Sequence, residues 1–246
     1  RTSAGYMSDA VAYRNGFAVG HTGEILTTGG QGDAELAGNG GLIYWNPDAG
    51  TAQVLVPEDA RGRERPRVAT VANAGGTLWV QTNAGDGLPG SNATLYRVDD
   101  GDWTAKTPVV VDRDGQRHEA GSSLLGTDMR GYDSGLMAVV GFPMEGSEDK
   151  NVAFGRWDSD AQAFEALPKA ADGVLRRTLT EVGPVAITAD AMWVWDLDGD
   201  GWRQIAGPLP LEGSKIVHIT TDPDTVYISS QTGLIWQTHR AAPTDR

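Results

Sequence analysis

Hydrophobic and polar residues alternate in short runs along this chain, and almost no segment has the 3.6-residue periodicity of an amphipathic helix. The runs are rich in β-branched and aromatic residues and are separated by Gly, Asp, Asn and Pro. This pattern is typical of β-strands joined by tight turns. The sequence therefore predicts an all-β fold.

The strand pattern also repeats. Residues 24–33 align without a gap on residues 77–86, and the aromatic run 41–45 aligns on 94–98, a shift of 53 residues that places Leu42 on Leu95. Further aromatic runs turn through Asp and Gly into a second strand, and they begin near Val152, Met192 and Leu234. Tandem four-stranded units of roughly 40 to 50 residues are typical of β-propellers.

We expect the first strand of the five units near residues 17–21, 67–73, 122–129, 175–181 and 215–220. The fifth unit lacks a fourth strand, and residues 10–14 form a spare strand near the N-terminus. If residues 10–14 complete the last sheet, the ring closes and two exposed edges are paired.

The sequence thus predicts a five-bladed β-propeller with four antiparallel strands per blade, the last blade completed by residues 10–14. A β-sandwich is the alternative. One domain would cover residues 1–246, with blades at approximately 15–57, 67–110, 121–169, 174–207, and 214–240 plus 10–14.

The run from Gly16 to Thr28, Gly-Phe-Ala-Val-Gly-His-Thr-Gly-Glu-Ile-Leu-Thr-Thr, resembles the start of a blade in neuraminidase-repeat and photosystem-assembly-factor propellers. The Asp-box of such blades, Ser-x-Asp-x-Gly-x-Thr-Trp, is absent, and the turns 99–103 and 198–202 only approximate it. The resemblance implies the propeller superfamily and assigns no functional residue.

Connections between the second and third strands are long in the first three predicted blades and short in the other two. The long ones are expected at residues 29–40, 82–93 and 143–150. Long loops on a rigid scaffold often carry recognition, although drifted insertions would look the same. Asp33 and Asp86, at matching positions of the first two loops, are candidate ligand-binding residues.

Arginines cluster in two connections on the same expected face. Arg61, Arg63 and Arg65 lie in residues 58–67, and Arg117 lies in residues 112–119. Guanidinium groups bind carboxylates with two hydrogen bonds, so an acidic sugar or an acidic partner loop is a plausible ligand. The alternative is that the first cluster pairs with neighbouring acidic residues as a solvated loop.

Asp196-x-Asp198-x-Asp200-Gly201 matches the front of a calcium loop. The glutamate that ends an EF-hand loop is missing, because Gly207 stands at the twelfth position. The loops of integrin-type propellers are more similar, but they carry an aspartate where Gln204 stands. The sequence allows a structural Ca²⁺ here or, alternatively, no cofactor and a turn built from aspartates.

Enzymatic signals are few. The chain contains no Gly-x-Ser-x-Gly elbow, phosphate loop or dinucleotide fingerprint. Asp112, Asp128 and Glu181 lie near the expected axial ends of first strands, where five-bladed glycosidases carry acidic residues. A glycoside hydrolase is therefore an alternative reading, although we expect a non-catalytic protein.

The composition excludes further classes of protein. With 33 acidic and 20 basic residues among 246, the formal charge is −13, which argues against a nucleic-acid partner. No apolar run is long enough for a membrane span. Cysteine is absent and lysine is scarce, which favours an extracytoplasmic setting. The chain begins at Arg1 without a leader, so we expect a targeting segment to have been removed.

These observations predict a secreted or cell-envelope propeller that binds a protein partner through the long loops of its first three blades. Tachylectin-like lectins are similar in size and blade number, which makes a glycan the alternative partner. Their sugar sites repeat in every blade, whereas the long loops here are confined to three. Most of the eight tryptophans lie inside expected strands, where they would pack between blades.

Overall fold

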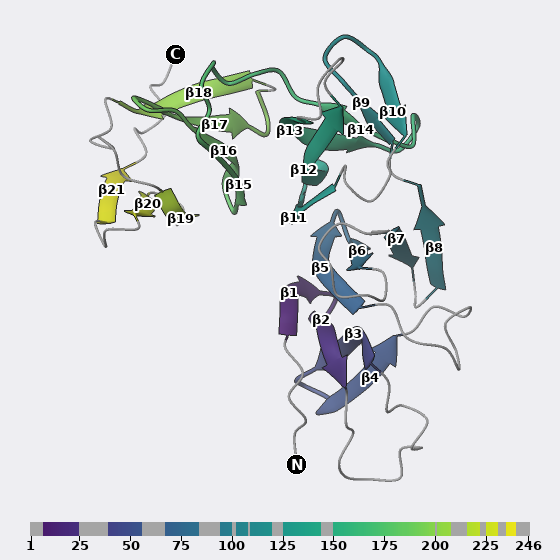
Figure 1. Cartoon of the computed structure of the whole chain (residues 1–246). Coiled ribbons are helices and arrows are strands. Elements are labelled where there is room, and N and C mark those ends of the chain that lie inside the picture. Colours follow the sequence, from purple (N-terminus) through teal and green to yellow (C-terminus); the bar gives the residue numbers. More distant parts are fainter. Residues whose placement is uncertain are drawn as a thin grey trace. The chain divides into compact units, whose positions relative to one another are not determined.

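The structure is a computed structural model, and it describes residues 7–24, 39–55, 67–83, 94–99, 102–107, 109–119, 125–143, 150–199, 201–207, 216–221, 225–230 and 235–239. Every element of secondary structure in these residues is a β-strand, so the all-β prediction is confirmed (Figure 1). None of them forms a helix that could span a lipid bilayer.

The chain divides into two compact units, Arg1–Ala166 and Leu167–Arg246. Within the three- and four-stranded sheets, strands that are consecutive in sequence pair antiparallel, as expected for tandem hairpins.

The first unit contains three sheets. The first sheet has the order β1 (Met7–Tyr13), β2 (Gly16–Glu24), β3 (Asn39–Asn46), β4 (Thr51–Leu55). The second has the order β5 (Arg67–Ala74), β6 (Thr77–Asn83), β7 (Thr94–Asp99), β8 (Asp102–Lys106). The third contains β11 (Leu125–Tyr132), β12 (Gly135–Pro143), β13 (Lys150–Asp158) and β14 (Ala163–Ala166), and it is extended beyond β14 by β9 (Val109–Val111) and β10 (Arg117–Glu119).

The second unit contains two sheets. One has the order β15 (Arg176–Thr180), β16 (Gly183–Ile187), β17 (Met192–Asp196), β18 (Gly201–Ala206). The other consists, within the described residues, of β19 (Ile216–Thr221), β20 (Thr225–Ser230) and β21 (Ile235–His239).

The expected role of residues 10–14 is wrong. Residues 10–13 belong to β1, which pairs along its length with β2 and forms the first strand of the first sheet rather than a strand of the last. A two-residue turn at Arg14 and Asn15 joins the two strands, and Arg14 has the positive φ (52°) that such hairpin turns require. A two-residue turn also joins β5 and β6, where both residues are glycines with positive φ. The N-terminal hairpin is therefore the equivalent of β5–β6.

This correction also changes the repeat. Residues 17–21, expected as a first strand, lie in the second strand, because β2 continues from Gly16 to Glu24 without a break. Gly20 pairs with Leu42, and Gln81 pairs with Leu95. The third strands are thus related by a shift of 53, from 42 to 95, but the second strands by a shift of 61, from 20 to 81. The connection 25–38 is longer than the connection 84–93, so an alignment without gaps cannot match the second strands and the third strands at the same time.

Neighbouring sheets of the first unit pack through apolar faces. Ala18, Leu42 and Tyr13 of the first sheet form a cluster with Val71, Leu78 and Val80 of the second. On the other side of the second sheet, Trp79 packs against Trp157 of β13, with ring centroids 5.2 Å apart. In the second unit, Val185 and Met192 pack against Ile228. Trp79 and Trp157 therefore pack between sheets as expected, whereas Trp45 is 45% exposed.

The first sheet has a second apolar face. The register aligns Ala12, Phe17, Trp45 and Ala52 in one row across all four strands. The rings of Phe17 and Trp45 stack with centroids 5.8 Å apart, and these side chains remain 41% and 45% exposed. A sheet that is apolar on both faces is suited to lie between two others.

The first strands of successive sheets in this unit lie close together. The Val71 N–H of β5 donates to Asp9 Oδ2 of β1 (3.1 Å), and Asn73 Nδ2 donates to the carbonyl oxygen of Ala12 (2.8 Å). Gly131 of β11 lies against the backbone of Asn73, so closely that a Cβ atom on Gly131 would overlap the Asn73 carbonyl group. The polar side chains of Asp9 and Asn73 thus hold β1 next to β5, and the absence of a side chain at Gly131 lets β11 approach β5.

Candidate functional site

The β9–β10 hairpin is a departure from the four-stranded plan of the neighbouring sheets. It follows the second sheet in sequence, yet β9 pairs in parallel with β14, where Phe164 is opposite Val110 and Glu165 is opposite Val111 (Figure 1). Val110 is fully buried and packs in the cluster that contains Trp157 and Phe164. The hairpin is therefore anchored in the apolar core of the first unit.

A tight turn closes this hairpin. The Gly115 N–H donates to the Asp112 carbonyl oxygen (3.1 Å), and the Asp112 N–H donates to the Gln116 carbonyl oxygen (2.9 Å). Gly115 has a φ of 79°, which an L-residue with a side chain rarely adopts. This is the three-residue hairpin loop in which a type I turn is followed by a glycine bulge.

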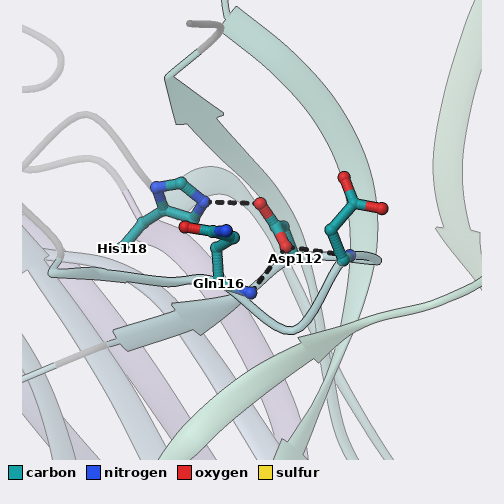
Figure 2. A network of polar contacts seen from close by, with 4 residues as sticks. Asp112, Gln116 and His118 are labelled. Atoms are coloured by element: carbon teal, nitrogen blue, oxygen red, sulfur yellow. Dashed lines mark hydrogen bonds and ion pairs between the residues drawn. The ribbon is translucent and has the colours of Figure 1, made fainter.

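The Asp112 carboxylate holds the turn together. Figure 2 shows that Asp112 lies between the backbone of Gln116 and the ring of His118. Its Oδ1 atom accepts hydrogen bonds from the N–H groups of Asp114 (2.9 Å) and Gln116 (2.8 Å), and its Oδ2 atom lies 2.7 Å from His118 Nε2. The Asp112 side chain is only 12% exposed. The carboxylate therefore preorganises the loop through three contacts.

The same contacts set the protonation of Asp112. The hydrogen bond with His118 lowers the pKa of the Asp112 carboxyl, and the two backbone N–H groups act in the same direction against the opposing effect of burial. Asp112 therefore stays ionised at neutral pH.

Two arginines lie on the exposed part of the hairpin. Arg117, predicted as a ligand-binding residue, is exposed in β10 and donates from Nη2 to the carbonyl oxygen of Ala161 in the β13–β14 turn (3.3 Å). Arg113 stands in the turn, where partial burial lowers the pKa of its guanidinium while Asp112 and Asp114 oppose this shift. The hairpin thus presents two cationic side chains from a braced backbone.

The other predicted ligand-binding residues are not described. Asp33 and Asp86 belong to the connections 25–38 and 84–93, and Arg61, Arg63 and Arg65 precede β5; all five lie outside the described residues. The described strands leave connections at 25–38, 84–93 and 144–149, where 29–40, 82–93 and 143–150 were expected, and shorter ones at 188–191 and 231–234.

The predicted calcium loop is the β17–β18 turn. Asp196 and Asp198 are exposed, and Asp200 lies outside the described residues. Asp196 Oδ1 accepts the Asp198 N–H (3.1 Å), which closes the turn with a side-chain oxygen. The described residues contain no cluster of three or more acidic or histidine side chains that could hold a metal ion.

The same arrangement occurs in two other turns. Asn46 Oδ1 accepts the N–H groups of Asp48 (3.0 Å) and Ala49 (3.1 Å). Asp158 Oδ1 accepts those of Asp160 (2.7 Å) and Ala161 (3.0 Å), and these bonds lower the pKa of Asp158. Asn46, Asp158 and Asp196 are each the last residue of the third strand of a sheet. The aspartate at 196 therefore has a role in turn formation that needs no ion.

The three carboxylates considered for hydrolysis lie on different elements. Asp128 lies in the first strand β11 as expected, and Glu181 is exposed in the turn after β15. Asp112 does not lie near a first strand, so this expectation is wrong: its hairpin pairs with β14, at the far edge of the third sheet.

Asp9 is the carboxylate that sequence reasoning missed. It stands four residues before the end of β1, as Thr70 does in β5 and Asp128 in β11. Burial raises the pKa of the Asp9 carboxyl, the charge of Asp128 adds to this effect, and the charge of Arg130 opposes it, as do the N–H groups of Val71 and Ala10. Asp9 joins β1 to β5 through its bond to Val71. Because Asp9, Thr70 and Asp128 stand at equivalent positions of three first strands, we expect this position to have a structural role.

Comparison with solved structures identifies the architecture. The structure of YCF48 bound to D1 peptide superposes on 98% of this chain with a TM-score of 0.54 at 14% sequence identity. The fold is that of a β-propeller. The Dos1 propeller aligns with a TM-score of 0.46 at 11% identity, over 97% of this chain and 59% of that one. For the extracellular domain of BT4673 from B. thetaiotaomicron the TM-score is 0.45 at 11% identity, over 100% of this chain and 37% of that one.

The propeller spans 65% of the YCF48 chain, which is less than two thirds of its length. No protein-family model and no curated protein sequence matches the propeller. At this identity the comparison shows the fold alone, so it is the predicted propeller fold that is confirmed.

Proposed function

We propose that the five sheets are the blades of a five-bladed propeller, and that the protein is a non-catalytic module that binds a protein partner outside the cytoplasm. The strand order of the sheets and the two apolar faces of the first sheet support the blade assignment, because a blade is covered by neighbours on both sides. Strong acidity, scarce lysine and absent cysteine support the extracytoplasmic setting.

The β9–β10 hairpin is the feature that best supports a binding role. It adds two strands to the third sheet, it is anchored by buried Val110, and the Asp112 contacts hold its backbone. A recognition element that is ordered before binding loses less conformational entropy on association, so affinity is gained without additional contacts.

The chemistry of the hairpin favours an acidic segment of a protein as the partner. Arg113 and Arg117 offer planar guanidinium groups, which bind carboxylates more specifically than an ammonium group does. Sugar binding in a propeller of this size would instead use a site repeated in each blade, and the hairpin is found in one sheet of the described residues. YCF48, of the same fold, was solved with a bound peptide, and we extend peptide recognition to this chain as part of the proposal.

The long connections complete the proposed surface. We keep the connections 25–38, 84–93 and 144–149 as candidate partner-binding loops, with Asp33 and Asp86 as residues to replace. Arg61, Arg63 and Arg65, which precede β5, are kept as further candidates. For the β17–β18 turn we propose closure by Asp196 without an ion, and a structural Ca²⁺ is the alternative.

The test uses a charge reversal and a matched control. The doubly substituted variant Arg113→Glu/Arg117→Glu and the control Arg203→Glu, which changes an exposed arginine of β18, are used as baits in envelope extract, and the captured proteins are quantified by mass spectrometry. We expect a partner captured by the wild type and the control to be depleted at least about tenfold by the hairpin variant, which corresponds to about 1.4 kcal/mol. Melting curves of all three proteins verify that the folds are intact.

Two outcomes would overturn the proposal. Equal capture by the hairpin variant and the control would remove the hairpin from the binding surface. Reproducible binding of the wild type to a glycan array, with no captured protein that depends on the hairpin, would favour the lectin-like alternative.

A further inference from the structure

We draw no further inference here: the strongest candidate, the apolar outer face of the first sheet around the stacked rings of Phe17 and Trp45, carries none because nothing in the structure shows what covers it.

Discussion

The close approach of β11 to β5 gives the sharpest test of the packing between the second and third sheets. Gly131 has no positive φ that would itself disfavour a side chain, so replacing it by alanine tests space alone. The added Cβ atom would overlap the carbonyl carbon and oxygen of Asn73 and approach the Ala74 nitrogen to 2.6 Å. These are backbone atoms of a paired strand, so no flexible side chain can move aside.

The magnitude follows from the cost of overpacking. Inserting one methyl group where the surroundings cannot adjust costs about 3 kcal/mol, the upper end of the usual range. In a protein of this length, each kcal/mol lowers the melting temperature by roughly 2–4 °C, so Gly131→Ala is expected to melt about 6–12 °C below the wild type. Differential scanning calorimetry measures the shift.

Alanine variants at two other glycines serve as controls for the Gly131→Ala variant. At Gly155 a Cβ atom would lie 3.0 Å from the Phe164 Cβ atom and 3.1 Å from Val140 methyl carbons, so the alanine variant should lose about 1 kcal/mol. At Gly201 the nearest atom would be 3.9 Å away, and alanine should change stability by less than about 0.5 kcal/mol. If Gly131→Ala melts as high as Gly201→Ala, the spacing of β5 and β11 described above is wrong.

Four further predictions test the anchors and charges. Val110→Ala should destabilise the protein by about 2 kcal/mol in urea unfolding, while Val152→Ala, at a position 40% exposed, should cost under about 0.5 kcal/mol; equal losses would refute the hairpin anchor. Because the folded-state pKa of Asp112 lies below 3.8, its contribution to stability is complete above pH 3.8 and is lost at lower pH, so the advantage of the wild type over Asp112→Asn should shrink as pH falls below 3.8. For Asp9 the sign is opposite: its folded-state pKa lies above 3.8, so the stability of the wild type relative to Asp9→Asn should decline as pH rises above 3.8, and a flat difference would contradict the raised pKa. Since Asp196 already closes its turn, a chelator should leave the melting temperature unchanged within about 1 °C, and a rise on adding Ca²⁺ would instead support the ion.

Local patterns made most of the fold predictable. Aromatic and β-branched runs such as Met192–Asp196 are strands, and first strands expected at 67–73 and 175–181 are found at β5 and β15. The N-terminal hairpin was missed because the ungapped repeat misaligned the second strands. Asn15 followed by Gly16 was the signal that could have revealed it, since this dipeptide favours a tight turn, although the turn residues are Arg14 and Asn15, one position earlier.

The candidate site was less predictable, and the reason is the distance in sequence between its parts. Asp112 and Gly115 mark a turn, but β9 is only three residues long and its partner β14 lies some fifty residues further on. No periodicity in Val109–Val111 specifies a parallel neighbour. The role of Asp9 likewise depends on a residue far away in the sequence, Val71, and nothing in the sequence of β1 indicates this contact.

The side-chain closure of the turns after β3, β13 and β17 affects how this protein can diverge and be engineered. In each, the accepting oxygen that fixes the reversal belongs to the final residue of the preceding strand. A foreign epitope inserted at 48–49 or 160–161 would move the Ala49 or Ala161 N–H away from that oxygen, whereas one inserted at 198–199 follows the Asp198 N–H that closes its turn. The β17–β18 hairpin is therefore a natural grafting point for display, as long as Asp196 is retained.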